Sequence, residues 1–462
     1  MLFQDLVQTS GRVAETSGRL AKVELLAALL RRAAPAEIAT AIAFLSGATP
    51  RQGRIGVGYA TLEAARADRP AAIGDGVASQ GSLQLADVDA LLERLSQTTG
   101  KGSTAAKQRL LRELFARASA AEQEFLFRLL IGELRQGALE GLMIEAVARA
   151  AGVAPGAVRR AAMLAGDLGA VARAALTAGS AGLARFGVQL FRPIQPMLAQ
   201  AADSVQDALT QLGEAAFEFK LDGARIQVHK AGDEVRVFSR LQNDVTVAVP
   251  EIVDAARRFV PREAILDGEA IALHPDGTPQ PFQVTMRRFG RKLDVERLRT
   301  ELPLSFAFFD LLYADGRVLL DEPYATRFVA LAEFVPAGSR VPRIVTADAR
   351  EAAAFFERAI AAGHEGLMAK ALGARYEAGG RGAAWLKVKR AHTLDLAVLG
   401  AEWGHGRRRG WLSNLHLGAR DPAGGFAMLG KTFKGMTDEL LAWQTARLLE
   451  LETGRASCRE RV

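Results

Sequence analysis

The feature that most constrains the fold is an abrupt change of pattern near residue 190. Residues 1–190 read as one helix after another, and one candidate helix repeats apolar side chains at Leu20, Val23, Ala27 and Leu30. The segment 191–199 then carries two prolines, which are typical of a linker. The pattern therefore predicts an all-α domain over residues 1–190, followed by a domain of another kind.

Beyond this linker, short apolar segments alternate with Asp-Gly and Gly-Asp turns such as Asp222-Gly223 and Asp315-Gly316. A helix is predicted over 351–362, because Gly363 is a typical helix end. The mixture predicts an α+β domain over 191–390. A third, strand-rich region follows over 391–462. The predicted strands of the α+β domain are 215–221, 224–230, 234–239, 264–273 and 304–313.

Composition sets loose limits. The chain has 462 residues, enough for two to four domains, and its hydrophobic content of 49% is ample for packed cores. The formal charge of +7 fits a polyanionic partner, although many soluble proteins match it. A single cysteine, Cys458, excludes a disulfide framework and a multi-cysteine zinc site. Since no stretch reads as a secretory signal or a membrane span, we expect a cytoplasmic protein.

Glycine-rich breaks in the helical region lie beside basic residues. Backbone amides at such breaks can bind phosphates, although helix ends and turns are the commoner explanation. For the region as a whole, phosphate contact is the favoured interpretation. The basic residues near these breaks include Arg51, Arg54, Lys101, Lys107 and Arg135.

Lys220 lies in the segment most suggestive of chemistry. Strand alternation places Glu218, Lys220 and Asp222 on one face, and Arg225 follows closely. A lysine amine is nucleophilic only in its neutral form, which neighbouring cations and burial favour. The segment therefore suits a nucleophile. A surface strand that ends in an Asp-Gly turn would give the same pattern, so both interpretations stay open on this segment alone.

Five further segments with polar residues follow Lys220 in order. Each has a structural explanation of its own, such as a core position for Phe309 or a solvent-facing strand for Lys387 and Lys389. Two acidic residues, Glu269 and Glu365, offer the hard oxygen ligands that Mg²⁺ prefers. The segments are Phe238-Ser239-Arg240, Leu266-Asp267-Gly268-Glu269, Phe308-Phe309-Asp310-Leu311-Leu312-Tyr313, His364-Glu365-Gly366-Leu367-Met368-Ala369-Lys370 and Trp385-Leu386-Lys387-Val388-Lys389, with Arg381 preceding the last.

Together with Lys220-x-Asp222-Gly223-x-Arg225, these segments resemble the ordered motifs of ATP-dependent DNA ligases within the covalent nucleotidyltransferases. The opening MLFQD, the segment 132–137 and the linker resemble the helical DNA-binding domain of three-domain ligases of archaea, eukaryotes and some bacteria. RNA ligases and capping enzymes lack that domain. NAD-dependent ligases carry a cysteine zinc site, which one cysteine does not build.

The resemblance implies three phosphoryl transfers. Lys220 takes AMP from ATP, AMP passes to the 5′-phosphate at a nick, and the adjacent 3′-hydroxyl then displaces AMP. The implied partner is nicked duplex DNA, bound through its backbone without sequence specificity by a monomeric protein. The resemblance also implies Mg²⁺ as cofactor.

The same resemblance implies a role for each motif residue, with Asp222 shaping the turn beside the lysine. Positioning and charge stabilisation would carry most of the catalysis. Glu218 would contact the adenine edge and Phe309 would stack on the base. Ribose or phosphate contacts would come from Arg225, Arg240 and Glu269. The α-phosphate would be bound by Lys387 and Lys389, Arg381 would act near the nucleotide or the nick, and Glu269 and Glu365 would hold the metal.

The end of the chain departs from the family pattern. In these ligases the third domain is a five-stranded OB fold that ends in an Arg-x-Asp-Lys motif, which orients pyrophosphate in the first step. No such motif follows Lys389, and the segment 454–462 does not read as a strand. We therefore expect an incomplete OB-fold domain with unpaired strand edges. This leaves a second hypothesis, a fragment that binds nicks without sealing them.

Overall fold

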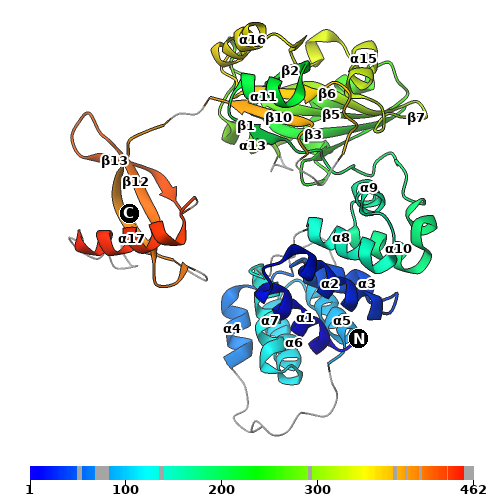
Figure 1. Ribbon diagram of the computed structural model, residues 1–462, viewed down its shortest axis with the longest axis vertical. Helices are drawn as coiled ribbons and strands as arrows, with labels where there is room; N and C mark the ends of the chain where they lie inside the picture. The colour runs from blue at the N-terminus through cyan, green and yellow to red at the C-terminus, as the bar shows by residue number, and fades with distance from the viewer. Residues whose placement is uncertain are drawn as a thin grey trace. The chain divides into compact units, whose positions relative to one another are not determined.

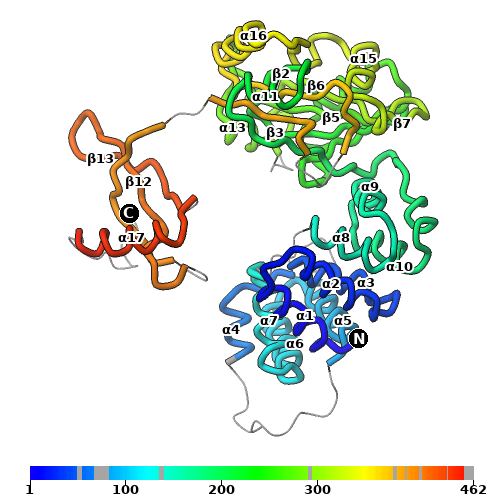
Figure 2. Tube along the Cα trace, in the orientation of Figure 1, coloured from blue at the N-terminus to red at the C-terminus, as the bar shows by residue number. Residues whose placement is uncertain are grey.

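A computed structural model describes residues 1–48, 55–67, 83–134, 140–289, 294–377, 382–390, 393–404, 408–433 and 435–451. The chain divides into two compact units, Met1–Lys389 and Arg390–Val462. Figures 1 and 2 show the first unit in blue to orange and the second in orange to red. Within the described ranges, no helix is long and apolar enough to cross a membrane.

The first part of the larger unit is helical, as the sequence predicts. One hydrophobic core joins these helices, and α7 begins at a capping box formed by Ser119 and Glu122. One detail of the predicted stripe is wrong, because Leu20 is 81% exposed while Val23 and Leu26 are buried. The helices are α1 (Phe3–Glu15), α2 (Arg19–Arg32), α3 (Ile38–Leu45), α4 (Tyr59–Ala67), α5 (Leu85–Gln97), α6 (Ser103–Arg117), α7 (Ala120–Ile131), α8 (Glu140–Ala151), α9 (Pro155–Ala165) and α10 (Leu168–Leu183).

Two five-stranded sheets follow the helices, and the five predicted strands all occur in them within a residue or two. The first sheet has the order β1-β10-β9-β2-β8 and the second β4-β3-β5-β6-β7. The first comprises β1 (Gln200–Ala202), β2 (Ala215–Lys220), β8 (Arg343–Thr346), β9 (Gly366–Ala371) and β10 (Trp385–Lys389). The second comprises β3 (Ala224–Ala231), β4 (Glu234–Ser239), β5 (Glu263–Ala272), β6 (Leu304–Ala314) and β7 (Arg317–Val318).

Helices cover the sheets, and α11 and α16 lie against the first sheet in Figure 1. A separate apolar cluster contains Ile265 and Leu312 of the second sheet together with Trp385 of the first. The sheet faces that carry the polar motif residues therefore pack around one shared apolar cluster. The helices of this part are α11 (Val205–Leu212), α12 (Pro250–Arg257), α13 (Phe282–Phe289), α14 (Val295–Glu301), α15 (Tyr324–Phe334) and α16 (Ala349–Ala361).

The Asp222-Gly223 turn does not join neighbouring strands, as a hairpin turn would. Its flanking strands β2 and β3 belong to different sheets, so the chain crosses here from one sheet to the other. Gly223 is required at the crossing, since a Cβ there would lie 2.2 Å from the carbonyl oxygen of Ala270. Lys220 consequently stands at the last position of β2, where the two sheets meet.

The predicted linker 191–199 is fixed to the second sheet by side chains. The N–H of Phe191 donates to Nδ1 of His229 at 3.0 Å. Gln227 accepts from the N–H of Ile194 at 2.7 Å and donates to its carbonyl at 3.1 Å. Because buried side chains bind its backbone, this segment is part of the larger unit's fold.

The smaller unit is strand-rich, as predicted, and also has a helix that the sequence reading missed. Its antiparallel strands β11 (Ala397–Trp403), β12 (Leu412–Arg420) and β13 (Phe426–Thr432) are followed by α17 (Asp438–Glu450). Gln444 of α17 donates to the carbonyl of Leu412 at 2.6 Å, which fixes the helix on β12. The segment 454–462 lies outside the described residues.

Candidate active site

Lys220 faces two other charged residues across the first sheet. Pairing places Lys220 opposite Gly366 of β9, and Gly366 opposite Lys389 of β10. The carboxylate of Glu365, just before β9, accepts a hydrogen bond from Nζ of Lys220 and lies 2.8 Å from Nζ of Lys389. Gly366 permits this approach, because a Cβ there would lie 2.1 Å from the carbonyl oxygen of Val388. The sheet thus brings two lysines onto one carboxylate.

The pKa values of the two carboxyl groups here shift in opposite directions. Burial alone would raise the pKa of Glu365, but hydrogen bonds from Lys220 and Lys389 hold it below its ordinary value. Burial, and then the charge of Glu365, raise the pKa of Asp222. Glu365 is therefore the ionised partner of the lysines. Asp222 lies close to the same cluster, where the sequence placed it.

Glu218 lies deeper on the same face of β2. Its carboxylate is 2.6 Å from Nζ of Lys370, and both side chains are at most 2% exposed. The hydroxyl of Tyr324 donates to the same carboxylate. The Lys370 ammonium also lies 4.5 Å from the ring centre of Phe309 and 4.3 Å from that of Trp385. These groups form a buried, charged cluster next to Lys220.

Arg225 and Asp267 form a second buried pair, on the other sheet. Two guanidinium nitrogens of Arg225 donate to the two oxygens of Asp267 at 3.0 and 2.6 Å. Arg225 also donates to the carbonyl of Met197 at 2.6 Å, and the hydroxyl of Tyr376 donates to Asp267 at 2.7 Å. Glu269 is the strand partner of Arg225, and burial raises its pKa to about 8.

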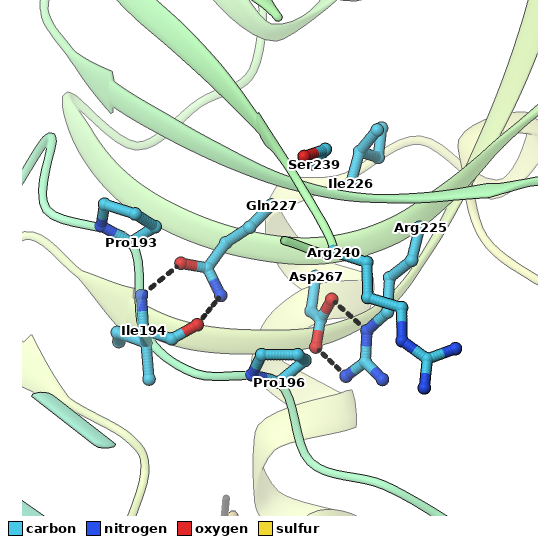
Figure 3. Close-up of a pocket in the computed structure, with 9 residues that line it drawn as sticks. All are labelled: Pro193, Ile194, Pro196, Arg225, Ile226, Gln227, Ser239, Arg240 and Asp267. Carbon is cyan, nitrogen blue, oxygen red and sulfur yellow. Dashed lines mark hydrogen bonds and ion pairs between the residues drawn. The ribbon is translucent and has the colours of Figure 1, made fainter. Parts of the chain in front are cut away.

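Arg240 borders a small pocket between the linker and the second sheet. Figure 3 shows its guanidinium beside that of Arg225, which is held by Asp267. The Arg240 side chain is exposed, in contrast to that of Arg225. The pocket is lined by Pro193, Ile194, Pro196, Arg225, Ile226, Gln227, Ser239, Arg240 and Asp267.

The remaining motif residues lie on the same inner faces or outside the described ranges. Phe309 is half-buried, and its ring meets that of Trp385 edge to face at 6.0 Å. Lys387 alternates with Lys389 on β10 and is half-buried opposite Met368. Arg381 lies outside the described residues. The structure therefore gathers Lys220, Glu218, Glu365 and Lys389 on one sheet and Arg225, Arg240, Glu269 and Phe309 on the other.

Comparison with known proteins matches both parts of the larger unit. A family described as "ATP dependent DNA ligase domain" matches residues 196–389, and "DNA ligase N terminus" matches residues 2–148. A "Probable DNA ligase" of Anaeromyxobacter sp. (strain Fw109-5) is 60% identical over 456 residues, which cover 98% of this chain and 86% of that protein. The chain belongs to the ATP-dependent DNA ligases.

Two other similarities agree with this family. "DNA ligase B" of Mycobacterium tuberculosis (strain CDC 1551 / Oshkosh) is 54% identical over 458 residues, covering 98% of this chain and 88% of that protein. The solved structure "Pmar-Lig_PreS3" has a TM-score of 0.60 and 17% identity, with 96% of this chain and 91% of that chain covered. The latter likeness is one of fold.

Several residues at the centre of this ligase's site were given no role from the sequence. Lys370 closes the segment that begins at His364, and strand alternation alone places it on the face of Gly366. Asp267 likewise precedes Glu269 by two residues in its motif. Tyr324 and Tyr376 lack such a signal, because both reach the site from outside the strands that carry the motifs.

Proposed function

We propose that this ligase seals nicks in duplex DNA by carrying AMP on Nζ of Lys220. The position of Lys220 carries the proposal. Its side chain is 20% exposed at the end of β2, hydrogen-bonded to Glu365, with Lys389 on the other side of that carboxylate. A partly buried lysine whose side chain is held in place by a hydrogen bond is positioned for an attack on a phosphate.

The surrounding residues suit the binding of ATP with its base on the buried side. Glu218 lies two residues before Lys220 on the same strand face, roughly 7 Å along the chain. We assign Glu218 to the adenine edge and Phe309 to the face of the base. Glu269, half neutral near pH 8, suits hydrogen bonds to ribose hydroxyls.

The proposed nucleotide-binding cations differ in whether protein groups already bind them, and Lys389 already donates to Glu365. The Arg225 guanidinium already donates to Asp267 and Met197, so its proposed contact with ribose or phosphate would add to these bonds. Arg240 is exposed beside it and is better placed for a phosphate. Lys387 and Lys389 point from one face of β10 and suit the α-phosphate. Arg381 stays a proposed contact near the nucleotide or the nick.

In the first step, Nζ of Lys220 loses a proton and attacks the α-phosphorus, and the bond to the pyrophosphate oxygen breaks. The proton passes to solvent, and Glu365, which is hydrogen-bonded to that nitrogen, holds the side chain in place. Lys387 and Lys389 stabilise the charge that develops on the phosphate oxygens. The 5′-phosphate of the nick then takes AMP from Lys220, and the 3′-hydroxyl displaces AMP as the strand closes.

The residues present fit Mg²⁺ as a metal shared between protein and phosphates. Within the described ranges, no three acidic, histidine or cysteine side chains come together as a metal site. Mg²⁺ commonly binds through only one or two carboxylates plus phosphate oxygens, and would neutralise charge on those oxygens. Glu365 is ionised and suits this role, while the raised pKa of Glu269 favours its neutral form.

We further propose the division into a DNA-binding domain over 1–190, an adenylation domain over 191–390 and an OB-fold domain over 391–462, in a monomer that binds nicked DNA. Of the basic residues near glycine-rich breaks, Lys107 is already engaged, since its ammonium donates to the carbonyls of Ile55 and Gly56 at 2.6 and 3.3 Å.

The relatives named as DNA ligases do not favour the alternative of a sealing-deficient fragment.

Two nicked substrates test the proposal. With ATP and a 5′-phosphorylated nick, the wild-type chain should seal DNA, whereas Lys220→Ala should not. Lys220→Ala should still seal a nick that already carries 5′-AMP, because only the loading of the lysine is blocked. Wild-type chain that binds nicks but seals neither substrate would support the fragment hypothesis. Sealing of the ATP-dependent substrate by Lys220→Ala would contradict the assignment of the nucleophile.

A further inference from the structure

Lys370 forms a buried ion pair with Glu218 but takes no part in the three transfer steps. Nζ of Lys370 lies 2.6 Å from Glu218 and donates to the carbonyl of Phe309 at 3.3 Å. It is enclosed by the rings of Phe309, Tyr324 and Trp385, whose centres lie 4.3–4.7 Å away. A lysine is rarely buried so fully unless its charge is paired.

Glu218 supports the positive charge of the buried Lys370. Burial lowers the pKa of Lys370, and the negative charge of Glu218 opposes that effect. An isolated carboxylate is equally costly to bury and takes up a proton instead. The Tyr324 hydroxyl adds a second hydrogen bond to Glu218. The ammonium and the hydroxyl both face the carboxylate, whose oxygens accept hydrogen bonds.

The pair lies where the proposed function places the edge of the purine. A base stacked on Phe309 shares that ring with the Lys370 ammonium, and the α-phosphate at Lys220 fixes the other end of the nucleotide. Adenine presents a 6-amino donor at this edge, whereas hypoxanthine and guanine present a 6-oxo acceptor. An ionised carboxylate binds the donor and repels the acceptor.

We propose that Lys370 is a positioning residue that determines base specificity: it holds Glu218 as an ionised acceptor for the 6-amino group and so excludes 6-oxopurines. The inference rests on the proposed loading of Lys220 with AMP. Lys370 acts through Glu218 and through the carbonyl of Phe309. Replacing Lys370 by an uncharged side chain removes the ammonium 2.6 Å from Glu218 and so releases the carboxylate from its position beside the 6-amino group.

The test compares ATP with inosine triphosphate, which differs from it at the 6-position, in covalent loading of the full chain. In Lys370→Met, the preference for ATP, measured as a ratio of kcat/KM values, should fall by roughly tenfold or more. Lys230→Met is a matched control. Lys230, on β3 of the second sheet, is also a buried lysine, but it donates to the carbonyls of Arg257, at the end of α12, and of Phe259. Its loss should leave the ratio unchanged.

Equal slowing with both nucleotides in Lys370→Met would overturn the inference, because a merely structural lysine would leave the ratio unaltered. If Lys370→Met does not fold, Tyr324→Phe removes one donor to Glu218 with little change of volume. It should lower the same ratio by a smaller factor, and an unchanged ratio in the folded variant would refute the account. Failure of wild-type chain to load Lys220 with either nucleotide would instead overturn the proposed function.

Discussion

His229 should make the larger unit lose stability in mild acid. Its ring is fully buried on β3, where Nδ1 accepts from the N–H of Phe191 at 3.0 Å and Nε2 lies 2.9 Å from the amide oxygen of Gln227. This arrangement needs a neutral ring that donates from Nε2, since a proton on Nδ1 would face the Phe191 donor. Burial accordingly lowers the pKa of His229 to about 3.

The sign and size of the effect follow from linkage. The unfolded chain binds a proton at this histidine near its ordinary pKa of about 6.5, and the folded chain does not until about 3. The contribution of the neutral His229 ring to the free energy of unfolding is therefore present above pH 6.5 and is lost as the pH falls towards 3. Between pH 6.5 and 5 the loss amounts to about 2 kcal/mol, at about 1.4 kcal/mol per pH unit.

Urea unfolding of wild type and His229→Asn at both pH values measures this effect. Asparagine is not ionisable but keeps an acceptor for Phe191, so the variant should lose about 2 kcal/mol less than wild type between pH 6.5 and 5. His274→Asn is the control, because His274 is exposed and its replacement should leave the pH dependence unchanged. Equal pH dependence in wild type and His229→Asn would refute the reasoning.

Three further predictions follow from single contacts. Gly223→Ala should destabilise the fold by about 2 kcal/mol or more in urea and abolish loading with AMP, because its Cβ would overlap the Ala270 carbonyl. Normal loading would show that the crossing is not so tight. Arg327→Met should cost about 3–5 kcal/mol, since it leaves Asp310 buried without the guanidinium that now binds it at 2.7 and 2.9 Å. A loss below about 1 kcal/mol would contradict that pairing. The free energy of unfolding of Glu269→Gln, relative to wild type, should be about 2 kcal/mol higher at pH 8 than at pH 6.5. The reason is that burial raises the pKa of Glu269 to about 8, so the folded wild type loses stability as the pH rises. A stability difference between variant and wild type that is equal at both pH values would count against the burial of Glu269.

The strands of the α+β region were predictable because alternation of apolar and polar residues sets which face is buried. Their pairing was not, and the crossing at Gly223 shows the reason. An Asp-Gly pair between two strands is typical of a hairpin turn, whereas here β2 and β3 enter different sheets. The need for glycine arises from the carbonyl of Ala270, which is remote in sequence. No local pattern carries that information.

The site could be predicted where ordered motifs carry it and not where remote residues complete it. Lys220, Glu365 and Lys389 come together as their motifs imply, because β2, β9 and β10 are neighbours. The motif around Arg225 did not reveal that Asp267 and Met197 already bind its guanidinium. Such engagement depends on how the linker packs, and side-chain packing leaves no periodic trace in a sequence.

The way in which the linker is held on the second sheet was not predictable from the sequence either. Two prolines correctly indicate that the helical pattern stops, but they do not reveal how the following residues are held. Gln227 and His229 alternate with core residues on β3 and bind the backbone of Ile194 and Phe191. Read alone, these polar residues are typical of a solvent-facing strand. Only the fold shows that the linker covers them.

The most direct measurement of the central claim is to identify the residue that carries AMP. The full chain is incubated with ATP and Mg²⁺, digested under conditions that preserve a phosphoramidate bond, and analysed by tandem mass spectrometry. The account predicts AMP on Lys220 and its loss when nicked DNA is added before digestion. AMP found instead on Lys370, Lys387 or Lys389, or an adduct that nicked DNA does not discharge, would contradict it.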